Sequence, residues 1–232
     1  MDTPDGAHPS AARRNRRVLL AGASGLVGRA ILHGLLADDT VLAVHVLARR
    51  ALGSSHSKLT VHVVDFTQLP PLPALDEVYL ALGTTIRAAG SQSAFRAVDL
   101  DANLAVARAG LAGGARRLGL VSAIGADARS RIFYNRIKGE LEDALQALGF
   151  DGLVVARPSL LTGERETLGQ PVRAGERVGA VLAGILKPLI PRRYRAIAAA
   201  DVAAALLARV PDAQGRVILP SDAMQPGTRT YV

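Results

Sequence analysis

The chain has 232 residues, of which 49% are hydrophobic and 21% charged, a composition typical of one globular domain with a large core. It contains no cysteine, which excludes disulfides, thiolate metal sites and cysteine nucleophiles. The net charge of +8 comes from scattered residues, and the 3% aromatic content without tryptophan leaves little to stack on bases. We therefore expect no nucleic-acid partner and no metal site.

Neither a membrane span nor an export signal is expected. The apolar stretch at residues 178–186 is about half as long as the roughly 18 residues that a transmembrane helix needs. The basic residues at 13–17 lead into a glycine-containing strand and not into an apolar signal segment. The sequence therefore predicts a cytoplasmic protein without a membrane partner, with a disordered leader over 1–12 and a single domain over 13–232.

Residues 18–28 form the most informative segment, because an apolar run passes directly into glycines at 22, 25 and 28 and then into a helical pattern. Gly22 permits a sharp turn, Gly25 lets a pyrophosphate approach the backbone, and Gly28 lets the helix pack against the strand. The N–H groups at the helix start would face the phosphates. A purely structural turn has the same spacing, so later residues must decide.

Strand and helix patterns alternate along the rest of the chain. We expect strands at 41–47, 59–64, 77–82, 117–121, 152–156 and 216–219, and helices at 93–110, 132–148, 178–186 and 201–209. This alternation predicts a doubly wound α/β fold, the Rossmann fold, with a parallel sheet of about seven strands. Residues 159–200 are expected to add a small substrate-side region. On helix 132–148, Glu140, Glu142 and Asp143 are assigned to the polar side.

The end of the second strand selects the dinucleotide. An acidic residue there binds the 2′-hydroxyl of NAD, whereas arginine accommodates the 2′-phosphate of NADP. Here Arg49 and Arg50 follow the strand, while Asp38 and Asp39 precede it at the wrong end of the sheet. Two guanidiniums at this edge favour NADP(H) over NAD(H), and a solvated basic loop is the alternative.

Further cofactor contacts are expected at the ends of the third and fourth strands. Asp65 and Phe66 stand where an adenine edge would lie, although an aspartate closing a strand is as often a turn former. Leu82, Gly83 and Thr84 end the fourth strand beside the glycine loop, where small residues would let the cofactor pass.

Catalytic residues are expected on helix 132–148. Tyr134 and Lys138 are four residues apart and therefore share one helical face. A phenol ionises near pH ~10 in water, and a neighbouring ammonium favours the ionised form. Ser122 directly follows a strand, so its hydroxyl emerges at the sheet edge that carries the glycine loop and could hydrogen-bond a substrate carbonyl oxygen.

Taken together, these motifs resemble those of the short-chain dehydrogenase/reductase superfamily. The glycine triplet, Ser122, the Tyr134-x-x-x-Lys138 pair and Arg157-Pro158 follow one another in that family's order. More narrowly, the chain is similar to the atypical branch that includes the Tat-interacting protein and its bacterial relatives. That similarity is carried by Leu82-Gly-Thr-Thr85, Val98-Asp99, Ser122-Ala-Ile-Gly-Ala-Asp127 and Tyr134-x-x-x-Lys-Gly-Glu140.

The resemblance implies roles for several positions. Lys138 would bind the nicotinamide ribose, and Tyr134 would exchange a proton while hydride moves between nicotinamide and substrate. Asn103 would be either a proton-relay residue or a plain polar helix residue. The complete set of expected cofactor contacts is Gly22, Ser24, Gly25, Leu26, Val27, Gly28, Arg49, Arg50, Asp65, Phe66, Leu82, Gly83, Thr84, Tyr134, Lys138, Pro158 and Leu160.

The sequence therefore predicts an NADP(H)-dependent oxidoreductase acting on a small carbonyl or alcohol substrate. Only 74 residues follow Pro158, too few for the large substrate domain of the family's nucleotide-sugar enzymes. The alternative is a non-catalytic NADP(H)-binding protein with a regulatory or redox-sensing role. The oligomeric state stays open.

Overall fold

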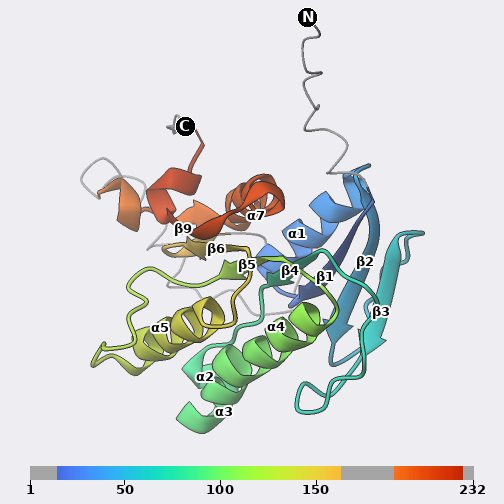
Figure 1. Ribbon diagram of the computed structural model, residues 1–232. Helices are drawn as coiled ribbons and strands as arrows, with labels where there is room; N and C mark the ends of the chain where they lie inside the picture. The colour runs from blue at the N-terminus through green and yellow to red at the C-terminus, as the bar shows by residue number, and fades with distance from the viewer. Residues whose placement is uncertain (1–14, 163–190, 227–232) are drawn as a thin grey trace, which may run out of the picture.

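Helices cover both faces of one parallel seven-stranded sheet in the computed structural model, which describes residues 15–162 and 191–226 (Figure 1). The strand order is β3-β2-β1-β4-β5-β6-β9. The strands of this sheet are β1 (Arg16–Ala21), β2 (Val41–Ala48), β3 (Leu59–Val63), β4 (Glu77–Leu80), β5 (Arg117–Val121), β6 (Gly152–Arg157) and β9 (Gly215–Pro220). This architecture confirms the expected doubly wound α/β fold.

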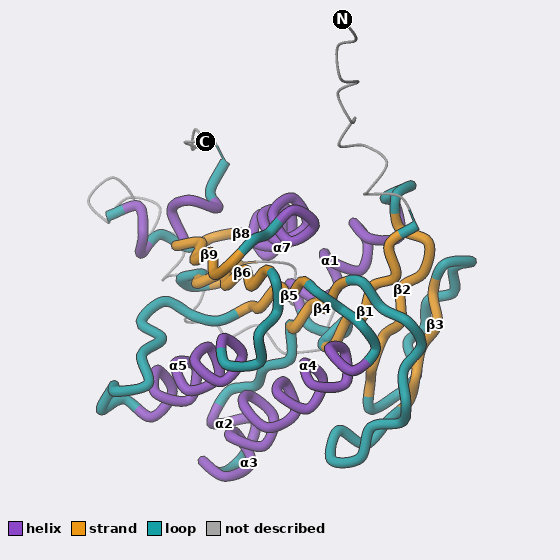
Figure 2. The backbone as a smooth tube through the Cα atoms, in the orientation of Figure 1, coloured by secondary structure: helices purple, strands orange, loops and turns teal. Residues whose placement is uncertain are grey.

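Two layers of helix enclose the sheet. The helices are α1 (Leu26–Ala37), α2 (Ile86–Ala89), α3 (Gln92–Arg96), α4 (Asn103–Ala112), α5 (Phe133–Gln146) and α7 (Ala199–Arg209). Helices α1 and α7 lie on one face and α4 and α5 on the other (Figure 2). Within the described residues, no helix is long and apolar enough to cross a membrane.

Apolar side chains of these helices form a separate core on each face. Ile31 and Leu206 are fully buried between α1, α7 and the sheet, and Val106 and Leu141 are fully buried between α4, α5 and the sheet. Both strand faces are therefore covered, which explains the nearly continuous apolar runs in the strands.

The helix expected over 93–110 is interrupted. Ser91 caps α3 by accepting a hydrogen bond from the N–H of Ala94, and a π-helical turn (Ala97–Ala102) separates α3 from α4. Such turns are rare and frequently occur at functional sites. The apolar period is continuous in the sequence, so it does not reveal this interruption.

The small C-terminal region is described only in part. The two-residue strands β7 (Leu161–Thr162) and β8 (Ile197–Ala198) pair with each other beyond the end of β6. Short 3₁₀ turns cover Arg192–Tyr194, Val210–Asp212 and Ser221–Met224. The helix expected at 178–186 and the leader at 1–12 lie outside the described residues.

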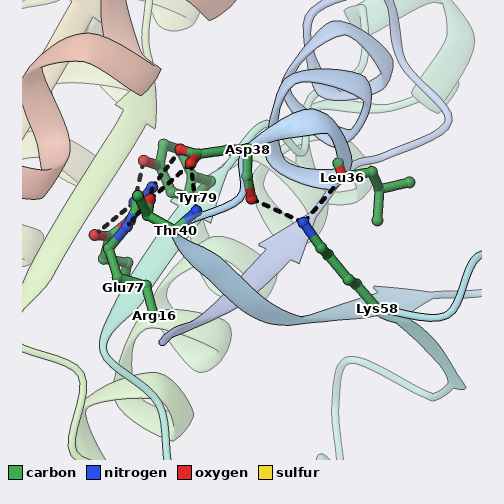
Figure 3. Close-up of polar contacts among 7 residues, drawn as sticks. All are labelled: Arg16, Leu36, Asp38, Thr40, Lys58, Glu77 and Tyr79. Atoms are coloured by element: carbon green, nitrogen blue, oxygen red, sulfur yellow. Dashed lines mark hydrogen bonds and ion pairs between the residues drawn. The ribbon is translucent and has the colours of Figure 1, made fainter. Parts of the chain in front are cut away.

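A buried polar network closes the amino-terminal edge of the sheet (Figure 3). Arg16 donates two hydrogen bonds to the Glu77 carboxylate, at 2.9 and 2.8 Å, and a third to Asp38 at 2.6 Å. The hydroxyl of Tyr79 donates to Glu77 at 3.2 Å, and burial together with the Glu77 charge raises the pKa of Tyr79 well above its usual value. Arg16, which belongs to the basic cluster at 13–17, is therefore a structural residue.

Lysine caps the end of helix α1 at the same edge. The Lys58 ammonium donates to the backbone carbonyls of Leu36 and Asp38, at 3.3 and 2.9 Å (Figure 3). These carbonyls belong to the last turn of the helix, where a cation is favourable. The Asp38 carboxylate is held at this end by Arg16, which agrees with its predicted position away from the cofactor edge.

Candidate active site

The glycine loop has a shape that only glycine permits at two positions. Gly22 has φ of +93°, and a Cβ atom there would lie 2.3 Å from the carbonyl carbon of Ala81. A Cβ atom on Gly28 would lie 2.0 Å from the carbonyl oxygen of Gly22. The turn and the first turn of α1 are therefore packed directly against each other and against the end of β4, as in a dinucleotide-binding loop.

No side chain caps the start of helix α1. Gly25 occupies the N-cap position, and Ser24 beside it is exposed. The N–H groups in the first turn, at Leu26 and Val27, therefore receive no hydrogen bond acceptor from a capping side chain. The helix dipole favours an anion at this end of the helix. The residues present fit the expected pyrophosphate-binding role.

Basic side chains stand at the end of β2. Arg49 and Arg50 directly follow this strand and are exposed. In the part of the chain that the structure describes, neither has an ion pair to a carboxylate. Their guanidiniums are available to a phosphate group at this edge.

Asp65 forms a turn after β3. Its carboxylate accepts the backbone N–H of Thr67 at 2.9 Å, and its carbonyl accepts the N–H of Gln68. The hydrogen bond from Thr67 lowers the pKa of Asp65. Phe66 is half-buried against the core on the α4 and α5 face. The turn-forming alternative for Asp65 therefore agrees with the structure, and an adenine contact stays a prediction.

Tyr134 and Lys138 lie on successive turns of α5. The half-buried ring of Tyr134 packs against Phe95, with ring centroids 5.6 Å apart. The ammonium of Lys138 lies 2.7 Å from one carboxylate oxygen of Asp99, and both side chains are buried. The second Asp99 oxygen accepts the backbone N–H of Thr84 at 2.8 Å. The end of β4 and the expected catalytic helix are thus joined through Asp99.

Gly83 lies directly over this ion pair. A Cβ atom on Gly83 would lie 3.5 Å from Asp99 and 3.8 Å from the Lys138 ammonium. Gly83 is exposed, whereas the two charged side chains beneath it are not. The structure therefore brings the predicted Leu82 to Thr84 segment to the edge that carries Lys138.

Asn103 has a structural role. Its side-chain amide is fully buried and donates to the backbone carbonyls of Leu82, Val98 and Asp99, at 3.3, 3.2 and 3.2 Å. These bonds tie the π-helical turn to the end of β4. Of the two interpretations left open for Asn103, the structure favours the polar helix residue.

Ser122 contacts helix α5 at Glu142. Its buried hydroxyl donates to the carboxylate of Glu142 at 2.6 Å. Glu142 follows Tyr134 by eight residues on α5, which is about 12 Å along a helix. In this structure the Ser122 hydroxyl is engaged by Glu142, and its expected role in binding the substrate carbonyl stays a prediction.

Glu142 was expected on the solvent side of its helix and is instead 1% exposed. It accepts hydrogen bonds from Arg157 at 2.6 and 3.0 Å and from Arg216 at 2.9 Å. The bond to Glu142 raises the pKa of Arg157, although partial burial opposes this. The cluster joins α5 to the ends of β5 and β6 and to β9. Its sequence signal is the spacing of four residues between Lys138 and Glu142, which places both on one face.

The remaining predicted contacts lie after β6. Pro158 is buried, and its carbonyl accepts the N–H of Ile124 at 2.9 Å, which links the loops after β6 and β5. Leu160 is 69% exposed at the same edge of the sheet. In the described part of the chain, no group of three or more histidine or carboxylate side chains could hold a metal ion.

Sequence comparison shows a clear relationship to one group of fungal proteins. No protein-family model matches the chain. It is 36% identical over 181 residues to the mitochondrial protein fmp52 of Emericella nidulans, covering 73% of this chain and 75% of that protein. Other relatives from Aspergillus, Eremothecium and Candida are also named mitochondrial. These names contradict the expected cytoplasmic location, which rested on the absence of a recognisable signal.

Solved structures share the fold. A short-chain dehydrogenase family protein from Francisella tularensis superposes with a TM-score of 0.67 and 13% identity, covering 90% of this chain and 98% of that one. A short-chain dehydrogenase/reductase superfamily protein from Agrobacterium tumefaciens, solved with bound NAD, has a TM-score of 0.65 and 17% identity, covering 88% and 77%. These likenesses confirm the expected fold, whereas membership of the short-chain dehydrogenase/reductase superfamily and of its Tat-interacting branch stays a prediction.

Proposed function

The chain belongs to the Fmp52 family. We propose that it is an NADP(H)-dependent oxidoreductase, which transfers hydride between the nicotinamide and a small carbonyl or alcohol substrate. The observation that carries this proposal is the position of Lys138. Its ammonium lies directly beneath Gly83, at the end of the strand that packs against Gly22 of the glycine loop. One edge of the sheet therefore holds both a fitting dinucleotide cradle and a phenol–ammonium pair.

Different residues of this chain would bind the cofactor and transfer the proton. The start of α1 would bind the pyrophosphate, and Lys138 would bind the ribose next to the nicotinamide. When bound, the cofactor supplies or accepts the hydride. In the direction of reduction, the Tyr134 hydroxyl donates its proton to the substrate carbonyl oxygen, and the Lys138 charge stabilises the resulting phenolate.

A specific observation favours the alternative function. The Ser122 hydroxyl, which was expected to polarise the substrate carbonyl, donates instead to the buried Glu142 carboxylate in the described structure. A serine engaged in this way favours an NADP(H)-binding protein that senses the cofactor and does not turn it over.

Turnover by the wild-type protein distinguishes these functions. We expect carbonyl-dependent loss of NADPH absorbance with at least one member of a panel of small aldehydes, ketones and quinones. The reverse assay uses NADP⁺ with the matching alcohols. Tight NADPH binding without turnover of any panel member would contradict the enzyme and favour the sensor.

The preference for NADP(H) is tested through the two arginines after β2. We expect wild-type protein to bind NADPH at least tenfold more tightly than NADH, because charge-assisted bonds to a phosphate contribute about 1.5–3 kcal/mol. Replacing Arg49 and Arg50 by alanine removes this difference. Dissociation constants from fluorescence titration give the comparison, with the exposed Arg108→Ala on α4 as a matched charge control. Equal wild-type affinities would contradict the phosphate-binding role.

A further inference from the structure

Asp99 and Lys138 form a buried ion pair at the proposed active site. Asp99 is 0% exposed and Lys138 is 4% exposed, and their charged atoms lie 2.7 Å apart. The N–H of Thr84 binds the other carboxylate oxygen of Asp99 at 2.8 Å. The carboxylate is therefore held from two sides, by the backbone at the end of β4 and by the ammonium on α5.

The other charged groups around this pair are either paired with one another or exposed to solvent. Arg96 on α3 lies 2.6 Å from Glu140 on α5, so those two charges largely cancel. The remaining charged side chains on α2, on α5 and on the segment from the π-helical turn to α4 are Arg136 near Glu140, Glu142 with Arg157 and Arg216, and the exposed Arg87, Asp101, Arg108 and Asp143. In the described structure, Asp99 is thus the carboxylate in contact with the Lys138 ammonium.

We propose that Asp99 is a positioning residue that keeps Lys138 charged and fixed beneath the cofactor site. An ammonium removed from water gives up its proton at a lower pH than an exposed one, by several units when burial is complete. A carboxylate at hydrogen-bond distance reverses this effect, because it stabilises only the charged form. The role of Asp99 in the reaction rests on the proposed function, since Tyr134 benefits from Lys138 only while Lys138 is a cation.

The π-helical turn gives Asp99 its place. The turn spans Ala97–Ala102, and its carbonyls at Val98 and Asp99 accept hydrogen bonds from the buried Asn103 amide. The same amide binds the carbonyl of Leu82, which precedes the exposed Gly83. The interruption between α3 and α4 therefore sets the carboxylate against both α5 and the end of β4.

Lysine resonances provide a direct test. The chain has only three lysines, Lys58, Lys138 and Lys187, so the Nζ and ε-carbon NMR signals are few, and Lys138→Arg assigns the one of interest. In Asp99→Asn, we expect the pH at which the Lys138 signal titrates to fall by more than one unit. The substitution Asp101→Asn, at an exposed position two residues further along the same turn, is the matched control and leaves the Lys138 titration unchanged. A Lys138 titration in Asp99→Asn that coincides with wild type would overturn the inference.

Substitution of Lys138 allows a second measurement, made on Asp99. It also tests the proposal if Asp99→Asn does not fold. Coupling between two proton-binding sites is reciprocal, so removing the Lys138 charge in Lys138→Met should also change the titration of Asp99. We expect the Asp99 carboxyl carbon signal to titrate more than one pH unit higher in Lys138→Met, because the buried carboxylate has lost its cation. An Asp99 signal that titrates at the wild-type pH would contradict the pair.

Turnover separates this inference from the function on which it rests. With a carbonyl substrate from the panel, Asp99→Asn is expected to lose activity more steeply than wild type as pH rises, and Asp101→Asn is not. If the pH profile of activity were unchanged in Asp99→Asn while Tyr134→Phe was inactive, the role of Asp99 would be contradicted. The proposed oxidoreductase function would then be retained. Full activity in Tyr134→Phe would contradict the proposed oxidoreductase mechanism. The NMR titrations would still test whether Asp99 keeps Lys138 charged.

Discussion

Replacing Tyr134 by phenylalanine is expected to reduce NADPH-dependent turnover by about 100- to 10,000-fold, the range typical of losing a general acid–base group. The ring remains, so its packing against Phe95 at 5.6 Å and the fold around α5 are retained. The hydroxyl is the atom lost, and in the proposed reaction it carries the proton to the substrate oxygen. NADPH absorbance at saturating substrate measures the effect.

Two controls make this result specific. NADPH affinity should change by less than about threefold in Tyr134→Phe, because no cofactor phosphate contact is removed. Tyr79→Phe removes a hydroxyl at the opposite edge of the sheet, where it binds Glu77, and should leave turnover near wild type. Equal turnover in wild type and Tyr134→Phe would show that another group moves the proton.

Replacing Glu142 by alanine is expected to destabilise the protein by about 3 kcal/mol, the lower end of the range for breaking a buried ion pair. Glu142 is 1% exposed, and its loss leaves the Ser122 hydroxyl and Arg157 without this shared acceptor, whereas Arg216 keeps its hydrogen bond to Gln146. The side chains of Arg157 and Arg216 are 28% and 25% exposed, so water recovers part of the energy. Urea unfolding followed by circular dichroism gives the free energy of unfolding.

The next residue on the helix is the matched control. Asp143 is exposed, and Asp143→Ala should change the free energy of unfolding by less than about 0.5 kcal/mol. If the two variants were equally stable, the Glu142 cluster would have no net stabilising effect. A Glu142→Gln variant should fall between them, since an amide oxygen still accepts one hydrogen bond while the charge is lost.

The fold was predictable because its signals are local. The strand over 117–121 has the predicted bounds, and α5 begins and ends within two residues of the expected 132–148. A parallel strand buried on both faces needs a continuous apolar run, and such a run is visible in the sequence itself. The π-helical turn was missed, because it changes the backbone hydrogen bonds without changing the apolar period.

The site was predicted less completely, since its polar contacts join distant elements. Tyr134 and Lys138 were found because one helix carries both. Asp99 lies 39 residues before Lys138, and only the tertiary structure brings them to 2.7 Å. Ser122 was judged by its place at a strand end, but the direction of its hydroxyl depends on where Glu142 is buried.

Long sequence separation between paired strands also determines when the sheet is completed during synthesis. Strand β6 pairs on one side with β5 and on the other with β9, where Gly152 meets Gly215 near the end of the chain. Until β9 leaves the ribosome, β6 remains an open edge whose residues Leu153–Ala156 are all apolar and would otherwise be buried. Such an edge is a template for aggregation and a target for chaperones. A chain that stopped before β9 would keep this apolar edge exposed, so the pairing of β9 with β6 is what covers it.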